Sequence, residues 1–331
     1  WSSDVCSSDL AIYNYNRNKL DELPNADQYL YSSYWGSSSL VPTNDYMFVE
    51  GKAIGLVRGF ISEGYYTVDD FNYTNGQYVL KEGVPDITKA LTATYMHPYD
   101  LPAGQTAFPG AAKFRDVDES GTVDLDDATC LGEVMPRHTG SFQLNFNYKN
   151  FDLSTNFNWT AGGKVYNVAA MINASGQEFD GIGAQRASWV ADAFKVYNVN
   201  AAGDLYAVTN PDELRALNAN AKYHLPYHQS GITSSEWLEN GSYLRLQTLT
   251  LGYTLPKNWL TKVHVDKIRL YLTATNLFTI TGYSGIDPEV NANPTGQSGF
   301  YSDLRIFPTL NMDFGTYPRA RTFTFGANIT F

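Results

Sequence analysis

The chain has 331 residues, of which 43% are hydrophobic, 15% aromatic and 17% charged, and its formal net charge is −11. This composition excludes a disordered, collagen-like or coiled-coil chain. An acidic excess without any cluster of Lys and Arg argues against a nucleic-acid partner. No segment approaches the roughly 18 consecutive apolar residues of a membrane-spanning helix. A β-barrel remains compatible with this composition, because its alternating strands leave mean hydropathy near average.

The first ten residues, WSSDVCSSDL, stand apart from the rest. They have neither helical nor strand periodicity and lack the apolar centre of a signal peptide. We therefore predict that residues 1–10 are a non-native scar and that residues 11–331 form one domain, which is part of a longer protein. The two cysteines, Cys6 and Cys130, are too few for a disulfide framework.

Alternation of apolar and polar residues predicts about seven strands, each near the 9–11 residues that cross a bilayer when tilted. They cover residues 12–18, 53–65, 142–148, 151–159, 243–255, 267–275 and 322–331. The pattern is clearest in the last strand and weakest in the first two. Only Lys149 and Asn150 separate two of the strands, which predicts a tight hairpin. The alternation changes phase within residues 243–247, which predicts a bulge.

Short and long connections alternate along the chain. The short ones are residues 149–150 and 256–266, and the long ones are residues 67–137, 162–241 and 278–318. Outer-membrane barrels have this asymmetry, with short periplasmic turns and long extracellular loops. If the chain ends on the periplasmic side, all three long segments lie outside the cell.

The polar face of the predicted strands is mostly Thr, Asn, Ser and Gly, which suits a water-filled pore. The outer face of a soluble sandwich is usually rich in Lys and Glu instead. Aromatic residues gather at strand ends, as an interfacial girdle requires; they are Tyr148, Phe151, Trp159, Tyr253, Trp259 and Phe331. The fold class predicted is all-β, an antiparallel transmembrane barrel segment, and the alternative is a soluble cell-surface β-sandwich that binds glycan.

Seven stretches of the chain then point to one family. They are YNYNRNKL (13–20), VEGKAIG (49–55), KFRDVDESGTVDLDD (113–127), NYKNFDLSTNF (147–157), GSYLRLQTLTLGYTLP (241–256), LYLTATNLFTITGYSGIDPEV (270–290) and YPRARTFTFGANITF (317–331). In this order they resemble the SusC/RagA-type TonB-dependent outer-membrane transporters of Bacteroidota. The resemblance covers only the C-terminal third of such a protein, so it implies about seven strands of a 22-stranded barrel and no plug domain.

The resemblance also implies a function and a set of partners. It implies import of oligosaccharides, or of other large nutrients such as peptides, across the outer membrane, with no covalent chemistry and therefore no enzyme. The expected partners are outer-membrane lipid, a SusD-like lipoprotein and, through the missing plug region, the TonB–ExbB–ExbD system. No cofactor is required by this function. A secreted carbohydrate-active enzyme is the least favoured class.

The acidic loop between residues 116 and 127 has the spacing of an EF-hand calcium loop. Oxygen donors occupy positions 1, 3, 5, 9 and 12, a Gly occupies position 6, and residue 122 would offer its carbonyl. The predicted ligands are Asp116, Asp118, Ser120, Thr122, Asp124 and Asp127. Asp at position 12 and Ser at position 5 depart from the usual pattern, and no clear amphipathic helix precedes the loop. The alternative is an acidic loop held by its own turns and by water.

Aromatic side chains in the long segments are the predicted ligand contacts, because sugar rings stack on aromatic faces. The candidates are Trp189, Tyr227, Trp237 and Tyr283, and the alternative is that they pack the loops together. Phe331 ends the last strand and resembles, within the family, the signal read by the outer-membrane assembly machinery.

Two further motifs are not expected to form functional sites. His224 and His228 have a zinc-ligand spacing, but Pro226 between them opposes a helix, so we expect two exposed imidazoles. Asp69 and Asp70 are expected to be solvated acids, because adjacent carboxylates alone do not make a glycosidase pair.

Overall fold

The computed structural model describes residues 5–24, 27–32, 41–92, 97–175, 187–225, 231–261, 265–290, 311–313 and 315–331. Within these residues, no helix is long and apolar enough to cross a membrane.

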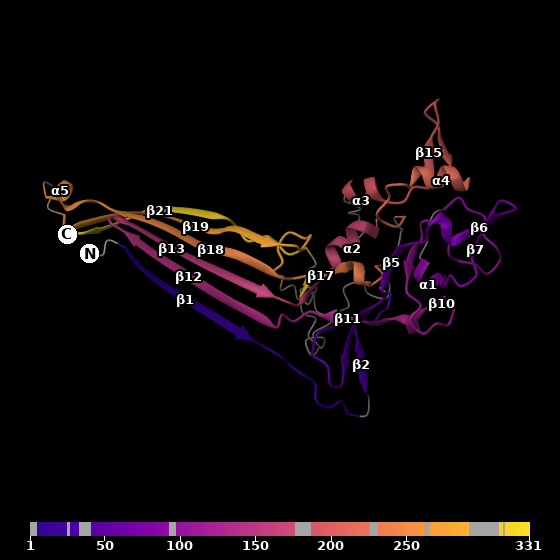
Figure 1. Ribbon diagram of the computed structural model, residues 1–331, viewed down its shortest axis with the longest axis horizontal. Coiled ribbons are helices and arrows are strands. Elements are labelled where there is room, and N and C mark those ends of the chain that lie inside the picture. Colours follow the sequence, from indigo (N-terminus) through magenta and orange to yellow (C-terminus); the bar gives the residue numbers. More distant parts are fainter. Residues whose placement is uncertain are drawn as a thin grey trace, which may run out of the picture.

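A six-stranded antiparallel sheet dominates the fold (Figure 1). Its strands, in spatial order, are β1 (Val5–Tyr15), β12 (His138–Tyr148), β13 (Phe151–Ala161), β18 (Tyr243–Thr254), β19 (Lys267–Thr281) and β21 (Thr322–Thr330). The order of these strands in space is their order in the sequence, and neighbours are antiparallel, so the sheet is an up-and-down meander. Five of the seven predicted strands are confirmed here at nearly their predicted bounds, and the strand predicted at residues 12–18 is the end of β1.

The register confirms the predicted hairpin and bulge. Tyr148 pairs with Phe151, so Lys149 and Asn150 form a two-residue turn, in which Lys149 has a φ of 53°. The pairing of β18 shifts between Leu246 and Thr248 against β19, where the sequence alternation changes phase. The shift lets apolar residues on both sides of the bulge stay on one face of the sheet.

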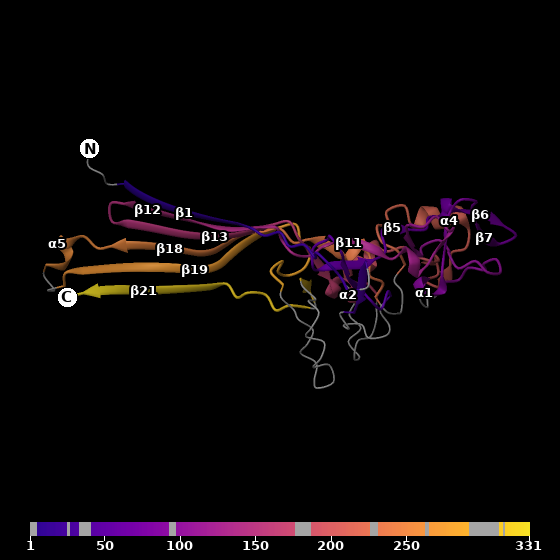
Figure 2. The same ribbon diagram turned by 90° about the horizontal axis from the view of Figure 1, so that it is seen from below.

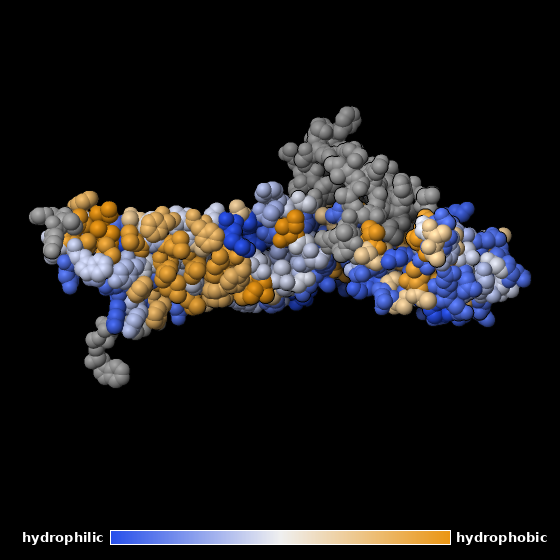
Figure 3. Space-filling view, turned by 90° about the horizontal axis from the view of Figure 1, so that it is seen from above, coloured by the Kyte–Doolittle hydropathy of each residue, from blue (hydrophilic) through white to orange (hydrophobic). Residues whose placement is uncertain are grey.

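That face of the sheet is apolar and exposed. Cross-strand partners share a face, and one row across the sheet joins Leu153, Leu251, Leu272 and Phe325. Leu251 is 47% exposed and Phe325 is 73% exposed, although both are large apolar side chains. The opposite face has rows of small polar residues, such as Ser154, Thr250, Thr273 and Thr324. Figure 3 shows hydrophobic residues spread over the strand-bearing part of the molecule.

The described residues within 27–134, 164–240 and 282–313 form a second region, which we call the cap. Figures 1 and 2 show the long strands running side by side toward the end where both chain termini lie, with the cap at the opposite end. The two short connections lie at the end with the termini, and the three long segments enter the cap, as the alternation of connection lengths predicted. The third long segment begins later than predicted, because β19 continues to Thr281.

The cap contains short strands in several small sheets. A four-stranded sheet contains β2 (Gln28–Tyr31), β3 (Tyr46–Val49), β4 (Leu56–Gly59) and β11 (Thr129–Glu133). A three-stranded sheet contains β14 (Lys164–Asn167), β17 (Leu238–Asn240) and β20 (Met312–Asp313). The two-stranded pairs are β5 (Ser62–Tyr65) with β9 (Ala112–Phe114), β6 (Phe71–Thr74) with β7 (Gln77–Leu80), β8 (Asp86–Ile87) with β10 (Thr122–Val123), and β15 (Tyr197–Val199) with β16 (Leu205–Ala207).

The helices are short. The α-helices are α1 (Lys89–Thr92), α2 (Val168–Ser175), α3 (Ala187–Asp192) and α4 (Pro211–Leu217), and outside the cap α5 (Lys257–Leu260) lies in the β18–β19 connection. Three 3₁₀ turns are η2 (Val68–Asp70), η3 (Leu125–Asp127) and η4 (Ser235–Trp237).

The buried core of the molecule lies in the cap rather than in the sheet. One cluster surrounds Phe60, Tyr66 and Phe108, each at most 1% exposed. A second cluster surrounds Tyr46 and Tyr166, which are fully buried. The aromatic residues of the long segments therefore fold these segments into an ordered body with its own core.

The strand predicted at residues 53–65 is wrong. This segment forms two short strands, β4 and β5, inside the cap. Val57 and Phe60 are both fully buried although they differ in parity, so both sides of the segment face protein. The chain between the two strands instead joins the segment before η4, since the Phe60 N–H donates to the Thr233 carbonyl at 2.8 Å. Weak alternation reflected burial on both sides, not a membrane-spanning strand.

Residues 5–10 belong to a strand, although the sequence shows no strand periodicity there. β1 begins at Val5 and pairs with β12 along its whole length. Backbone hydrogen bonds require no alternation of side chains, so the absence of a pattern did not prevent pairing. Asp9 pairs with Leu144 and so lies on the apolar face, where the remaining strands have no acid. That misplaced charge agrees with a non-native origin, which stays a prediction.

Two glycines on the polar side of the sheet allow close approach of their neighbours. A Cβ at Gly252 would collide with the carboxylate of Asp152 and the guanidinium of Arg269. These two groups form a bidentate ion pair at 2.9 and 2.5 Å across the glycine. A Cβ at Gly326 would collide with the ring of Tyr271. The larger side chains thus lie flat against the sheet.

Candidate functional site

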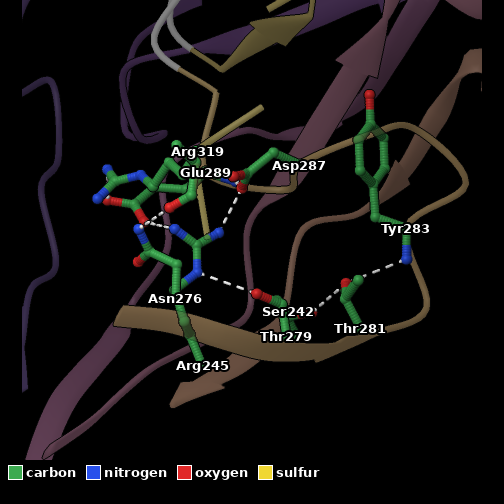
Figure 4. A network of polar contacts seen from close by, with 10 residues as sticks. Ser242, Arg245, Asn276, Thr279, Thr281, Tyr283, Asp287, Glu289 and Arg319 are labelled. Atoms are coloured by element: carbon green, nitrogen blue, oxygen red, sulfur yellow. Dashed lines mark hydrogen bonds and ion pairs between the residues drawn. The ribbon is translucent and has the colours of Figure 1, made fainter. Parts of the chain in front are cut away.

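A buried arginine holds the loops to the sheet at its cap end (Figure 4). Arg245 lies on the polar face of β18 and is 2% exposed. Its Nη2 lies 2.5 Å from Asp287 Oδ1, its Nη1 lies 3.0 Å from Glu289 Oε2, and its Nε donates to Thr279 Oγ1 at 3.0 Å. Arg319 joins the network from the segment before β21, with Nη2 at 2.6 Å from Glu289 Oε1. Every charge here is paired, as burial requires.

The network borders a cavity of about 330 Å³ on the polar side of the sheet. Arg245, Asn276, Phe278, Arg319 and Arg321 are among its lining residues. Both β19 and the segments on either side of the last long connection contribute to it. The sequence signal for this site was an arginine inside an otherwise apolar and Thr-rich strand, and our sequence analysis missed it.

Three of the predicted calcium ligands come together. Carboxylate oxygens of Asp116, Asp118 and Asp127 all lie within 4.8 Å of one another. Asp124 is not part of that cluster, because its carboxylate caps η3 by accepting from the Asp126 N–H at 2.8 Å. Ser120 Oγ donates to the Thr122 carbonyl at 3.0 Å, so the two remaining candidates contact each other.

The loop is also held by its own hydrogen bonds. The fully buried carboxylate of Asp127 accepts from the backbone N–H of Val117 at 2.5 Å and of Asp124 at 2.8 Å. Hydrogen bonds from Ser120 lower the pKa of Asp118, which therefore stays ionised at neutral pH. The loop presents an ionised, partly ordered set of oxygens, and the same bonds would hold it without a cation.

The described aromatic candidates pack inside the cap. Trp189 is 7% exposed and Trp237 is 4% exposed. Trp189 stacks on Tyr223 with ring centroids 3.9 Å apart, and the centroid of Trp237 lies 5.3 Å from that of Trp189. Tyr283 is 6% exposed and donates to Asp313 Oδ2 at 2.6 Å. Their burial leaves little open ring face for a sugar, which favours the packing interpretation for these three. Tyr227 lies outside the described residues.

The aromatic cluster brings together two titratable groups that our sequence analysis treated separately or overlooked. His224 is 3% exposed, not solvated as we predicted, and its Nδ1 contacts the Leu225 carbonyl at 2.8 Å. Its Nε2 lies 3.9 Å from Glu236 Oε2. Burial lowers the pKa of His224 to about 4 and raises the pKa of Glu236 to about 7. His228 lies outside the described residues.

The other predicted residues are spread over the molecule. Phe331 follows β21 and is 85% exposed, on the parity of Phe325 and Ile329. Asp69 pairs with Arg215 at 2.9 Å and Asp70 pairs with Lys113 at 2.7 Å, so these acids hold the cap together. The role of Phe331 in assembly stays a prediction.

Known proteins resemble this chain over nearly its whole length. TonB-dependent receptor P3 of Formosa agariphila is 29% identical over 317 residues, which are 96% of this chain and 26% of that protein. TonB-dependent receptor SusC of Bacteroides thetaiotaomicron is 26% identical over 246 residues, which are 72% of this chain and 19% of that protein. This chain is a relative of the SusC-type TonB-dependent receptors.

A solved structure of the RagAB peptide transporter has the same fold in the corresponding part, with a TM-score of 0.60 and 19% identity. The likeness covers 100% of this chain and 28% of the solved chain. The chain thus spans about a quarter of the length of the receptors that it matches. No protein-family model matches it.

Proposed function

We propose that this chain is the C-terminal part of an outer-membrane, TonB-dependent importer of large nutrients. In this proposal the six-stranded sheet is one side of a 22-stranded barrel, with the apolar face toward lipid and the Thr- and Asn-rich face toward the pore. The observation that carries the proposal is the apolar face of the sheet, on which each of the six strands exposes a large apolar or aromatic side chain; these are Tyr13, Phe146, Phe151, Leu251, Leu272 and Phe325. In water such a face would be unsupported, whereas in a bilayer it meets acyl chains.

The cap would lie outside the cell and contact a SusD-like lipoprotein. Energy would come from TonB–ExbB–ExbD acting on the plug region of the complete receptor. Oligosaccharides are the substrate that the SusC-type resemblance favours. A peptide is the close alternative, because RagAB is a peptide transporter.

The membrane part of this proposal is tested by labelling single cysteines in the complete receptor, with Cys6 and Cys130 replaced by Ser. A lipid-soluble maleimide should label Phe325→Cys, and a membrane-impermeant maleimide added from the aqueous side should label Thr324→Cys. These neighbours lie on opposite faces of β21. Lipid-soluble labelling of Thr324→Cys with protection of Phe325→Cys would reject the barrel.

The substrate is tested by uptake. Cells that express the receptor should accumulate labelled malto-oligosaccharide or labelled peptide only when TonB is present. Accumulation of one but not the other decides between the two substrate classes. If neither is taken up although the cysteines label as expected, the barrel stands and both substrate proposals fail.

We also propose that residues 116–127 bind calcium, because three carboxylates from one loop lie within 4.8 Å of one another. Such charges repel unless a cation or hydrogen-bond donors separate them. Calcium would stiffen an exposed part of the cap rather than catalyse a reaction. Removal of calcium should speed proteolytic cleavage within the loop, and Asp118→Asn should have the same effect. Asp126→Asn is the matched control, since this acid lies outside the carboxylate cluster.

A further inference from the structure

A small cavity in the cap combines aromatic rings with carboxylates. It has a volume of about 170 Å³. Its walls come from α2, α3, η4, β17 and the segments that follow α4 and β19, and are formed by Ala170, Ala174, Trp189, Tyr223, Glu236, Trp237, Glu239 and Ser284. The cavity lies apart from the arginine network and from the calcium-type loop, whose residues do not line it.

The charge of the lining residues has one sign. Glu236 and Glu239 are acidic, and among the described residues no Lys or Arg lines the cavity. The carboxylate of Glu239 is already bound, because it accepts from Asn167 Nδ2 and from the N–H and hydroxyl of Ser284, all at 2.7 Å. Glu236 differs, since its one ionic contact in the described part of the chain is His224 Nε2 at 3.9 Å.

That contact does not supply a full counter-charge to Glu236. Burial holds the pKa of His224 down, so its imidazole is neutral at pH 7. In the part of the chain that the structure describes, the other charged group that lines the cavity is Glu239, which has the same sign as Glu236. Lys222 lies close by in sequence, but its Nζ pairs with Asp192 Oδ2 at 2.8 Å. A carboxylate that is withdrawn from water without a cation is energetically unfavourable, and a cationic ligand would relieve that state.

The aromatic walls favour the same type of ligand. Three electron-rich rings, those of Trp189, Tyr223 and Trp237, surround one side of the cavity, and an organic cation is attracted to such rings. The buried indole N–H of Trp189 has no hydrogen-bond acceptor in the described structure. A volume of 170 Å³ equals that of about six water molecules, which suits a head group rather than a whole oligosaccharide.

We propose that this cavity binds a primary alkylammonium group, with the carboxylate of Glu236 as its counter-ion and the rings of Trp189, Tyr223 and Trp237 around its alkyl part. Such a group occurs on lysine side chains, on peptide amino termini and on amino sugars. The proposal concerns equilibrium binding by the cap and does not depend on transport, so it can hold even if the import proposal fails.

The test uses the complete protein that carries this chain, purified in detergent, with n-butylammonium chloride as the probe and n-butanol as its neutral analogue. Saturation-transfer NMR at constant ionic strength measures both. We expect saturable binding of n-butylammonium and at least about tenfold weaker binding of n-butanol. Glu236→Gln should weaken n-butylammonium binding by at least about tenfold, which corresponds to about 1.4 kcal/mol.

Two further variants complete the test. Glu82→Gln makes the same chemical change at an exposed acid far from the cavity and should leave binding unchanged. Ala170→Leu fills the cavity without changing any charge and should abolish binding, which separates occupation of the cavity from attraction to the acidic surface. Equal binding of n-butanol, undiminished binding by Glu236→Gln or Ala170→Leu, or no saturable binding of n-butylammonium would each overturn the proposal.

Discussion

The sheet and the cap follow opposite rules for burial. In the cap, aromatic side chains such as Phe60 and Tyr166 are fully buried, and a buried acid such as Asp127 is held by backbone hydrogen bonds. In the sheet, the large apolar side chains of Phe325 and Leu272 are exposed, while the charged side chain of Arg245 in β18 is buried. The same chain therefore places its apolar groups inside in one region and outside in the other. The difference indicates two environments, water around the cap and an apolar phase around the sheet.

The contrast predicts that removing a core ring destabilises the cap alone. Phe60→Ala deletes a fully buried ring that packs beside Phe114, and such deletions cost about 3–5 kcal/mol. We expect faster proteolysis of the cap, while the heat resistance of the membrane part, measured by gel migration, stays unchanged. Tyr73→Ala is the control, because Tyr73 is 41% exposed. Loss of both regions together would show that they fold as one unit.

The sheet should respond to charge instead of to lost volume. Leu272→Arg places a cation on the apolar face, which costs about 2–4 kcal/mol near the centre of a bilayer. Thr273→Arg introduces the same side chain one residue later, on the polar face, and should cost much less. The measurement is the urea unfolding of the complete receptor in lipid vesicles. Equal costs for the two variants would remove the distinction between the faces.

A pH-dependent prediction concerns Glu236 in the cap. Its pKa rises from 4.5 to about 7 on folding. Ionisation of Glu236 therefore has no effect on stability below pH 4.5, destabilises the cap increasingly between pH 4.5 and 7, and reaches its full cost above pH 7. Glu236→Gln should therefore match the wild type near pH 4.5 and be more stable by up to about 3 kcal/mol above pH 7. Protonation of His224 also destabilises the cap, but as the pH falls from 6.5 to about 4. Both the wild type and Glu236→Gln contain His224, so this contribution is common to the two proteins. Urea unfolding of the cap between pH 4.5 and 8 measures the difference, and a difference that does not change with pH contradicts the assignment.

The smallest expected effect is local to α4. The side chain of Asn210 accepts from the backbone N–H groups of Asp212 and Glu213 at 2.9 and 3.1 Å and so caps this helix. Asn210→Ala should cost about 1 kcal/mol of cap stability. Asn210→Ser keeps a capping oxygen and should lose much less. Hydrogen exchange of the Glu213 amide measures the change directly. Equal exchange rates in the two variants would argue against a capping role for the Asn210 side chain.

The sheet could be predicted from the sequence because its two faces meet different surroundings. A strand with one apolar and one polar face alternates, so β12, β13, β18, β19 and β21 could be predicted, although β12 begins four residues before its predicted start and β19 continues six residues past its predicted end. The method failed where the two faces are alike. Residues 53–65 lie between protein on both sides and lost their alternation. The start of β1 pairs through its backbone alone, so residues 5–10 gave no pattern.

The cap sites were harder to predict, because they depend on contacts between distant parts of the chain. Trp189, Tyr223 and Trp237 meet although up to 48 positions separate them. Glu236 is unremarkable in sequence and becomes unusual only through burial beside His224. The loop at residues 116–127 was different, because its oxygens are close in sequence. Three of its six predicted ligands lie within 4.8 Å of one another, Asp124 caps η3 instead, and calcium binding there stays a prediction.

Gly252 and Gly326 have a consequence for the width of the proposed pore. Because neither residue has a Cβ, the Arg269–Asp152 pair and the Tyr271 ring recline along the wall instead of standing upright. Two absent methyl groups thereby set how far large side chains project into the opening near the end where the chain termini lie. Replacing either glycine with alanine would push a phenol or an ion pair inward and constrict the passage, with no change to the lipid-facing surface.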